Sequence, residues 1–526
     1  MHRRSLLILG SALGLPVWSR SGAASTAPTE ARIAWPFNVG PLNPHLYSPN
    51  QMFAQSMVYE PLVHYTEGGG IVPWLARAWE ISPDGRDYTF HLREGVRFSD
   101  GRPFDAPAVA ANFAAVMANR ARHAWLALVE RIAGFDAPDA ATFRLHLRTP
   151  YYPTLAELSL PRPMRFLSPA AIPPGGNTAQ GIAAPIGTGP WKLERSIPGE
   201  SDIFVRNETY WGPKPVLERL VVKVVPDATT RALALQSGEI DIVYGTDLLD
   251  AEAIARLGAD PHLLARSSPP IGTRLLELNS ARFPTDSLAV RQAVQHAVDT
   301  EAMVHSILRD AEPVAHTLFA LNVPYADVGL APVRYDPARA AALLEAAGWK
   351  LPAGGGVRQR EGKSLVFDLS FVGPEALQKA VAETVQGMLL KVGISVRLVG
   401  EEPASFYARQ KSGEFGMIFG DTWGPPYDPH AFLASMRAPS HADYQAQRGL
   451  AEKPEIDRRI TAVVEETNEA RRREDYAWLL RALHSSAVYL PISYLTNKCV
   501  QSRRFAPMPF GATQSEMPFE QLRPAT

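Results

Sequence analysis

The chain has 526 residues, which is longer than a single hydrophobic core usually serves, so we expect at least two domains. Apolar residues make up 46% of the sequence and charged residues 20%, which is typical of a folded globular protein. The 53 basic and 54 acidic residues give a formal net charge of −1. This balance predicts no basic surface and argues against nucleic acid as a partner.

Residues 1–24 have the pattern of an export signal, with Arg3 and Arg4 before an apolar run and small residues at its end. The run is too short and too interrupted to span a bilayer. The arginine pair resembles a twin-arginine signal, and an ordinary secretion signal stays open as the alternative. Cys499 is the only cysteine, which excludes an internal disulfide and an N-terminal lipid anchor. We therefore expect a protein free in a periplasm.

The first half of the chain predicts a strand, turn and strand over 82–104, because Asp84-Gly85 and Asp100-Gly101 are typical turn pairs. Asp105 is then expected to cap a helix that runs to residue 128. The spacing of apolar residues predicts a buried stripe on this helix, formed by Val109, Phe113, Val116 and Met117.

The later half alternates between strand and helix patterns. A helix is predicted over 336–349, with Asp336 as its cap and Gly348 as its stop. The segments that follow predict strands at 364–373, 395–400 and 415–420 and helices at 375–393 and 405–413. Such alternation favours a parallel sheet with helices on both faces. Since ligands bind beyond the carboxyl ends of such strands, the loop that starts at 420 is expected to line a cleft.

These two differently built regions predict two lobes joined by crossing strands at 273–279 and 488–496. We expect lobe I to comprise 25–272 and 495–526, with an extra subdomain, and lobe II to comprise 273–494.

Six ordered blocks carry a resemblance to a known family. They are WEISPDGRDYTFHLREGVRFSDGRPFDA (79–106), PIGTGPW (185–191), VRNETYWGPKPVLERL (205–220), PDATTRALALQSGEIDI (226–242), AVRQAVQHAVDTEAMV (289–304) and YDPARAAALLEAAGW (335–349). Together they resemble the family 5 solute-binding proteins of ABC importers, which bind peptides or nickel. The resemblance implies an α/β, two-lobed periplasmic binding protein of type II-like architecture, with a hinge and an interlobe ligand cleft.

Four further segments, at 34–63, 118–125, 151–166 and 422–443, resemble the nickel-binding members of this family. This likeness implies a receptor that captures nickel as a complex with a small carboxylate chelator, for example histidine. It also implies an inner-membrane ABC permease as the partner, a monomeric state and no catalysis. The sequence contains no GxSxG, HExxH or Walker pattern that would suggest an enzyme.

The resemblance assigns His441 as the metal ligand, and imidazole suits nickel. No second histidine stands at helical spacing from His441, which fits a metal whose other ligands come from the chelator. Arg122 and Arg162 match the positions that bind the chelator's carboxylates, since a guanidinium binds a carboxylate through two parallel hydrogen bonds. The implied pocket wall comprises Tyr47, Met52, Trp125, Trp423 and Tyr427. Spacing i, i+3 predicts that Arg122 and Trp125 share one helix face.

The sequence departs from the nickel-binding pattern at Gly420-Asp421, where those members carry a His-Arg pair. A carboxylate here weakens attraction for an anionic chelator and can hold an amine, so Asp421 is a candidate modifier of the site. A short-peptide receptor therefore stays open as the alternative, and heme remains a further ligand class. We interpret His430 as structural, on a short helix that Asp428 is expected to cap.

Overall fold

The computed structural model describes residues 28–46 and 52–525. The predicted export signal at 1–24 and the predicted wall residue Tyr47 lie outside these ranges. Within the described ranges, none of the helices combines the length and the apolar character that a membrane crossing needs.

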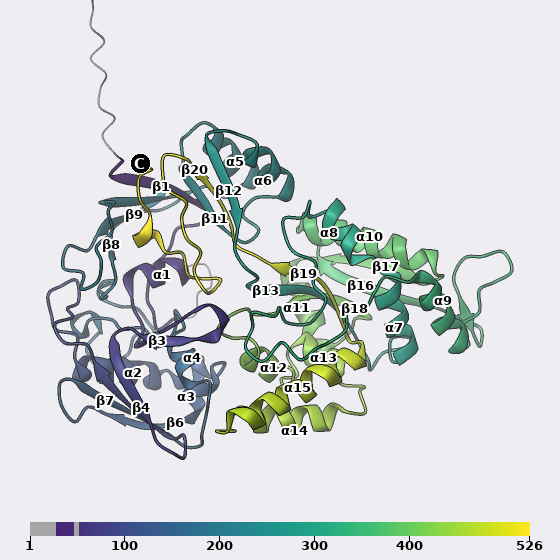
Figure 1. Ribbon diagram of the computed structural model, residues 1–526, viewed down its shortest axis with the longest axis horizontal. Helices are drawn as coiled ribbons and strands as arrows, with labels where there is room; N and C mark the ends of the chain where they lie inside the picture. The colour runs from purple at the N-terminus through teal and green to yellow at the C-terminus, as the bar shows by residue number, and fades with distance from the viewer. Residues whose placement is uncertain (1–27, 47–51, 526) are drawn as a thin grey trace, which may run out of the picture.

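A seven-stranded sheet forms the centre of lobe I (Figure 1). Its strands, in spatial order, are β12 (Leu263–Ser267), β20 (Lys498–Ser502), β11 (Ile242–Gly245), β1 (Glu30–Trp35), β10 (Arg219–Val224), β9 (Ser201–Arg206) and β8 (Trp191–Ile197). The strand β1 runs parallel to β10 and β11, whereas β20 runs antiparallel to β11 and β12. The helices of this lobe are α1 (Met52–Val58), α5 (Ala228–Gln236) and α6 (Ala251–Gly258). Cys499 is buried in β20, which agrees with a packing role.

Lobe II is built on a five-stranded sheet with the order β17 (Ser395–Glu401), β16 (Val366–Val372), β18 (Met417–Asp421), β13 (Gly272–Leu278) and β19 (Tyr489–Leu495). The three predicted strands are present, and β16 runs parallel to both β17 and β18. The predicted parallel arrangement is confirmed for these three strands, whereas the added strand β13 is antiparallel to β18 and to β19. These two strands enter from and return to lobe I, which fixes their directions.

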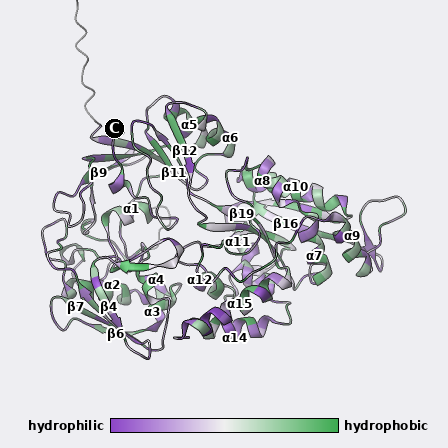
Figure 2. Cartoon of the chain, in the orientation of Figure 1, coloured by the Kyte–Doolittle hydropathy of each residue, from purple (hydrophilic) through white to green (hydrophobic). Residues whose placement is uncertain are grey.

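The predicted helices of lobe II are present as α9 (Pro337–Ala346), α10 (Ala376–Lys391) and α11 (Pro403–Ser412). The carboxylate of Asp336 accepts a hydrogen bond from the Arg339 amide at 2.8 Å, as expected for the cap of α9. Further helices of this lobe are α7 (Leu288–Ala297), α8 (Thr300–Ser306), α12 (His430–Ser435), α13 (Ala442–Gln447), α14 (Lys453–Val463) and α15 (Glu469–Ser486). Hydrophilic residues dominate α14 and α15 in Figure 2, while Ile456, Ile460 and Val463 make a buried stripe on α14.

A third unit, the predicted subdomain, has a four-stranded antiparallel sheet with the order β4 (Ala76–Ile81), β5 (Asp87–Leu92), β7 (Thr142–Leu147) and β6 (Ile132–Asp136). Both predicted turns are present, because Gly85 and Gly101 adopt φ of 70° and 86°. The first predicted strand of 82–104 is β5. The second is absent, and residues 97 and 103 make only an isolated bridge.

The helix predicted over 105–128 begins as expected but ends early. The Asp105 carboxylate accepts the Ala108 amide at 2.9 Å, and α2 spans Ala106–Ala118. The Asn119 side chain then donates to the Ala115 carbonyl at 3.1 Å, a local hydrogen bond of the kind that competes with helix continuation. The chain continues as a 3₁₀ turn, Arg120–His123, and the short helix α3 (Ala127–Arg131).

One apolar core joins the subdomain to helices of lobe II. It contains Phe113 of α2 together with Phe432 of α12 and Ile456 of α14. Polar contacts run beside it: the hydroxyls of Tyr152 and Tyr476 lie 2.6 Å apart. The subdomain and these lobe II helices therefore pack directly on each other.

The two lobes are connected through residues 268–271, between β12 and β13, and through 496–497, between β19 and β20. The predicted strands are present as β13 and β19, which lie side by side in the lobe II sheet next to these connections. The Ser268 amide donates to the Asn497 carbonyl and the Asn497 amide donates to the Ser268 Oγ, each at 2.9 Å. The connections therefore form one paired hinge. The exact lobe boundaries given above stay predictions.

We expect Phe113→Ala to lower the free energy of unfolding by about 3–5 kcal/mol, because the ring is buried and packs on Phe143 with centroids 4.8 Å apart. Ile81→Ala in the neighbouring sheet is the matched control, since Ile81 is 46% exposed; its effect should stay within about 0.5 kcal/mol. Urea unfolding followed by circular dichroism measures both, and equal effects would contradict this packing.

Candidate functional site

The loop that follows β18 is hydrogen-bonded to β13, the strand that begins next to the hinge. The Thr422 amide donates to the Thr273 carbonyl at 2.9 Å, and the Thr273 amide donates to the Thr422 hydroxyl at 3.0 Å. Gly424 adopts φ of 72°, and a Cβ there would lie 2.0 Å from the Ile271 carbonyl oxygen. Only glycine therefore fits this close approach to the crossing segment.

Asp428 closes the same loop instead of capping α12, so the capping prediction was wrong. Its Oδ2 accepts the Gly424 amide at 2.9 Å, while the N-cap of α12 is Pro429, without a side-chain hydrogen bond. Burial raises the pKa of the Asp428 carboxyl to about 7, against the opposing effect of hydrogen bonds from Thr422 and Gly424. His430 follows as the first residue of α12 and is buried, with Nε2 3.3 Å from Oε1 of Glu157. This packing suits a structural residue.

The rings of Trp423 and Tyr427, both in this loop, contact rings from other segments of the chain. Tyr427 lies 6.3 Å from Trp423 with an edge-on geometry of 83°, and 6.4 Å from Trp125, between ring centroids. Trp423 in turn lies 5.7 Å from the His441 ring. Trp125 comes from the subdomain and the other three from lobe II, so three of the predicted wall residues lie together with the predicted metal ligand.

Two predicted arginines stand on the lobe I side. Arg162 is buried and its guanidinium carbon lies 5.1 Å from the Trp125 ring centroid, within the range of a cation–π contact. Arg122 is exposed in the 3₁₀ turn. Burial, and then the charges of Arg122 and Arg162, lower the pKa of His123 to about 4. The charges of both arginines therefore act on the His123 imidazole, which stays neutral near pH 7.

The predicted shared helix face of Arg122 and Trp125 was wrong, because α2 ends at Ala118 and the two residues fall in and after a 3₁₀ turn. The 3₁₀ turn nonetheless keeps them close in the chain. Met52 is the first residue of α1 and half-buried. Its approach to a metal stays a prediction.

His441 is half-buried at the N-cap position of α13, and burial lowers its pKa. A lowered pKa keeps the imidazole neutral near pH 7, the form that binds a metal. Across the described residues, no group of three or more His, Cys, Asp or Glu side chains is arranged to hold a metal ion. The part of the chain that the structure describes thus offers the His441 imidazole here and no preformed metal cage.

Asp421, the predicted modifier, is the last residue of β18 and lies opposite Arg274 in the β13–β18 ladder. Part of the residue reaches solvent, yet loss of hydration among the surrounding atoms raises the pKa of its carboxyl to about 6. The Arg274 charge opposes this rise, while Asp247 and Glu312 add to it. The cation that faces Asp421 is therefore part of the chain. Arg274 was missed at the sequence level, although an arginine inside the apolar run TRLLELN signals a buried partner.

The family model for bacterial extracellular solute-binding proteins, family 5 (middle region), matches residues 70–444. The chain belongs to this family. The nickel-binding periplasmic protein of Escherichia coli K12 is 51% identical over 501 residues, which is 95% of each protein. The dipeptide-binding protein of the same organism is 28% identical over 434 residues, or 75% of this chain and 76% of its own length.

Among solved structures, NikA from Brucella suis in complex with Fe(III)-EDTA superposes with a TM-score of 0.92 at 52% identity. The match covers 94% of this chain and 99% of that one. The two-lobed fold of a periplasmic binding protein is therefore established, as the family resemblance implied. The named relatives are solute-binding receptors rather than enzymes.

We expect the stability of this family 5 protein to depend on pH through Asp428. Because the folded-state pKa is raised from the ordinary 3.8 to about 7, the folded chain holds a proton that the unfolded chain has lost. Stability relative to Asp428→Asn should therefore fall as pH rises between about 4 and 7, by at most roughly 1.4 kcal/mol per pH unit. Unfolding curves at a series of pH values measure this difference, and parallel profiles for the two proteins would contradict the assignment.

Proposed function

We propose that this family 5 protein is a periplasmic receptor that captures nickel as a complex with a small carboxylate chelator and delivers it to an inner-membrane ABC permease. The observation that carries the proposal is the placement of one neutral imidazole, His441, against the aromatic wall of Trp423 and Tyr427, with Arg162 behind Trp125 on the facing side.

The chemistry of such a site requires two contributors. Nickel accepts imidazole nitrogen and takes several ligands, whereas the described residues include no group of three or more His, Cys, Asp or Glu side chains that could hold it beside His441. A chelator would complete the coordination sphere, and its carboxylates would meet Arg122 and Arg162. The aromatic rings would cover the faces of the complex and exclude water, which strengthens each charged contact.

The relatives support a metal complex as the ligand. A protein named for nickel binding is 51% identical to this chain, and the 52% identical Brucella protein was solved with iron held in EDTA. EDTA is itself a polycarboxylate that surrounds its metal. These relatives are also periplasmic receptors by name or family, which supports a periplasmic location and a permease partner. We propose a monomer as the functional form.

The mechanism that we propose is ligand-linked closure. Trp125 and Arg162 lie on the lobe I side, whereas Trp423, Tyr427 and His441 lie on lobe II. A complex that touches both sides binds the closed form more tightly than the open form, so it shifts the population toward closure. The permease would then recognise the closed shape.

A short-peptide receptor is the second candidate, favoured by the Asp421 carboxylate at the end of β18 and by the dipeptide-binding relative. In that function Asp421 would hold the amine of the peptide. The proximity of the Arg274 charge opposes this role, because a carboxylate that already faces a buried guanidinium gains less from a ligand amine.

We expect calorimetric titration of metal-free protein to show binding of nickel mixed with L-histidine, and His441→Ala to weaken it at least about 10-fold because the chain's metal ligand is lost. His305→Ala is the matched control, since this histidine is exposed on α8. Nickel alone and a dipeptide mixture complete the comparison. Heat from the dipeptides with none from nickel and histidine, and no effect of His441→Ala, would establish the peptide receptor instead.

A further inference from the structure

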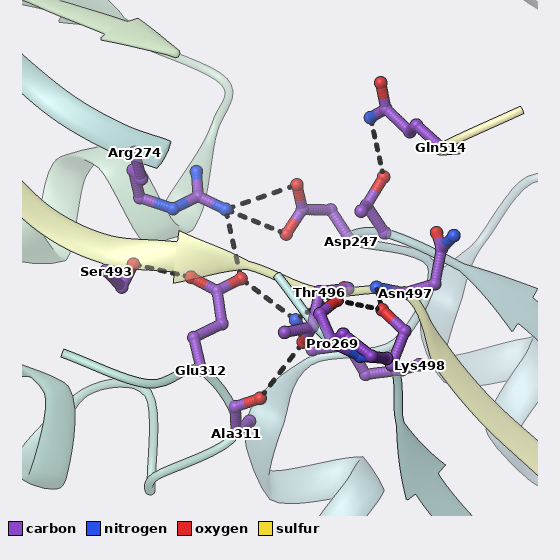
Figure 3. A network of polar contacts seen from close by, with 12 residues as sticks. Asp247, Pro269, Arg274, Ala311, Glu312, Ser493, Thr496, Asn497, Lys498 and Gln514 are labelled. Atoms are coloured by element: carbon purple, nitrogen blue, oxygen red, sulfur yellow. Dashed lines mark hydrogen bonds and ion pairs between the residues drawn. The ribbon is translucent and has the colours of Figure 1, made fainter. Parts of the chain in front are cut away.

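Arg274 lies where the two lobes meet, and its guanidinium is shared between them (Figure 3). Its Nη2 lies 3.2 Å and 3.4 Å from the two carboxylate oxygens of Asp247, which follows β11 in lobe I. The same nitrogen lies 3.5 Å from Oε1 of Glu312, on the loop that follows α8 in lobe II. Arg274 itself belongs to β13, so the Asp247 pair joins lobe I to lobe II.

Glu312 is held independently of Arg274. It accepts the Ser493 hydroxyl, from β19 of lobe II, at 2.6 Å and the Lys498 ammonium, from β20 of lobe I, at 2.9 Å, as Figure 3 shows. The side chains of Arg274 and Glu312 are 5% and 2% exposed, whereas that of Asp247 is 58% exposed. A buried guanidinium needs a permanent partner, and Glu312 provides it. The contact with Asp247 can therefore break and reform at lower cost, because water can take the place of the partner.

Arg274 also adjoins the base of the aromatic loop. Its ladder partner on β18 is Asp421, and the next ladder step joins Thr273 to Thr422 by two hydrogen bonds. Trp423 follows directly. A shift of β13 relative to lobe I would therefore be transmitted to this ring within two residues.

We infer that Arg274 is a positioning residue for ligand capture, which pairs with Asp247 across the hinge when the cleft closes and thereby sets lobe closure and the placement of the Trp423–Tyr427 wall together. This inference rests on the proposed function, since its main readout is the affinity for the captured complex.

Asp247→Asn is the decisive variant, because an exposed side chain can be changed without disturbing the fold. We expect the dissociation constant for nickel mixed with L-histidine to rise roughly two- to fivefold, with unchanged urea unfolding. Glu252→Gln is the matched control: Glu252 of α6 also pairs across the lobes, with Arg309 at 3.5 Å, but Arg309 lies outside β13 and β18. The control should bind as the wild type does.

A double-mutant cycle distinguishes positioning from general stabilisation. Once Arg274→Gln has removed the cation, adding Asp247→Asn should cause no further loss of affinity, and Arg274→Lys should restore part of it. Unchanged affinity in Asp247→Asn, or additive effects in the double variant, would overturn the inference.

Failure of the proposed function is separable from failure of the inference. If wild type binds no nickel with L-histidine, the function is wrong, and small-angle scattering of the ligand-free proteins then decides the inference. A larger radius of gyration for Asp247→Asn than for wild type and Glu252→Gln would support the hinge role of the pair, and identical values for the three proteins would overturn it.

Discussion

The lobes of this protein are joined covalently through two short segments, 268–271 and 496–497, within the part of the chain that the structure describes. Ser268 and Asn497 hydrogen-bond to each other, so the two segments bend as one hinge. All other contacts between the lobes are noncovalent and can break. In the proposed mechanism, capture of a ligand is one rotation about this hinge, and the free energy of closure depends on the groups that meet between the lobes.

Some of these groups contact each other whatever the ligand, and others would contact the ligand itself. The apolar core that joins Phe113 to Phe432 and Ile456 holds the subdomain against the lobe II helices without contact to a ligand. The ring contacts around Tyr427 add about 0.5–1.5 kcal/mol each, whereas a hydrogen bond from a guanidinium to a carboxylate adds about 1.5–3 kcal/mol. In the proposed complex, the arginines would thus decide which ligand carboxylates are accepted, and the rings would decide which shapes fit. The single imidazole would select for a metal.

Much of the fold follows from local sequence signals. The period of the apolar residues and the Asp336 cap predicted α9, and the alternation of segments predicted β16, α10, β17, α11 and β18. These features depend on residues within a few positions of one another. The early end of α2 was not predicted, because the chain continues as a 3₁₀ turn that the spacing of the apolar residues does not signal. The antiparallel direction of β13 was not predicted either, because it depends on the chain entering this sheet from lobe I.

The site divides in the same way. The family resemblance predicted His441, Trp423, Tyr427, Trp125 and Arg162 as site residues, and the structure brings these five together. The hinge network was not predictable, because its members are far apart in the sequence: Ser493 and Glu312 are separated by 181 positions. Asp428 was misassigned as a helix cap because its true partner, the Gly424 amide, is defined only once the loop has folded.

In the proposed function, nickel is held between His441 and a chelator bound by Arg162. The most direct measurement is an anomalous-diffraction map at the nickel edge, from crystals grown with nickel and L-histidine. The account predicts one strong peak within bonding distance of a ring nitrogen of His441, with chelator density reaching the Arg162 guanidinium. A peak remote from His441, or an empty cleft with peptide-like density beside Asp421, would contradict it.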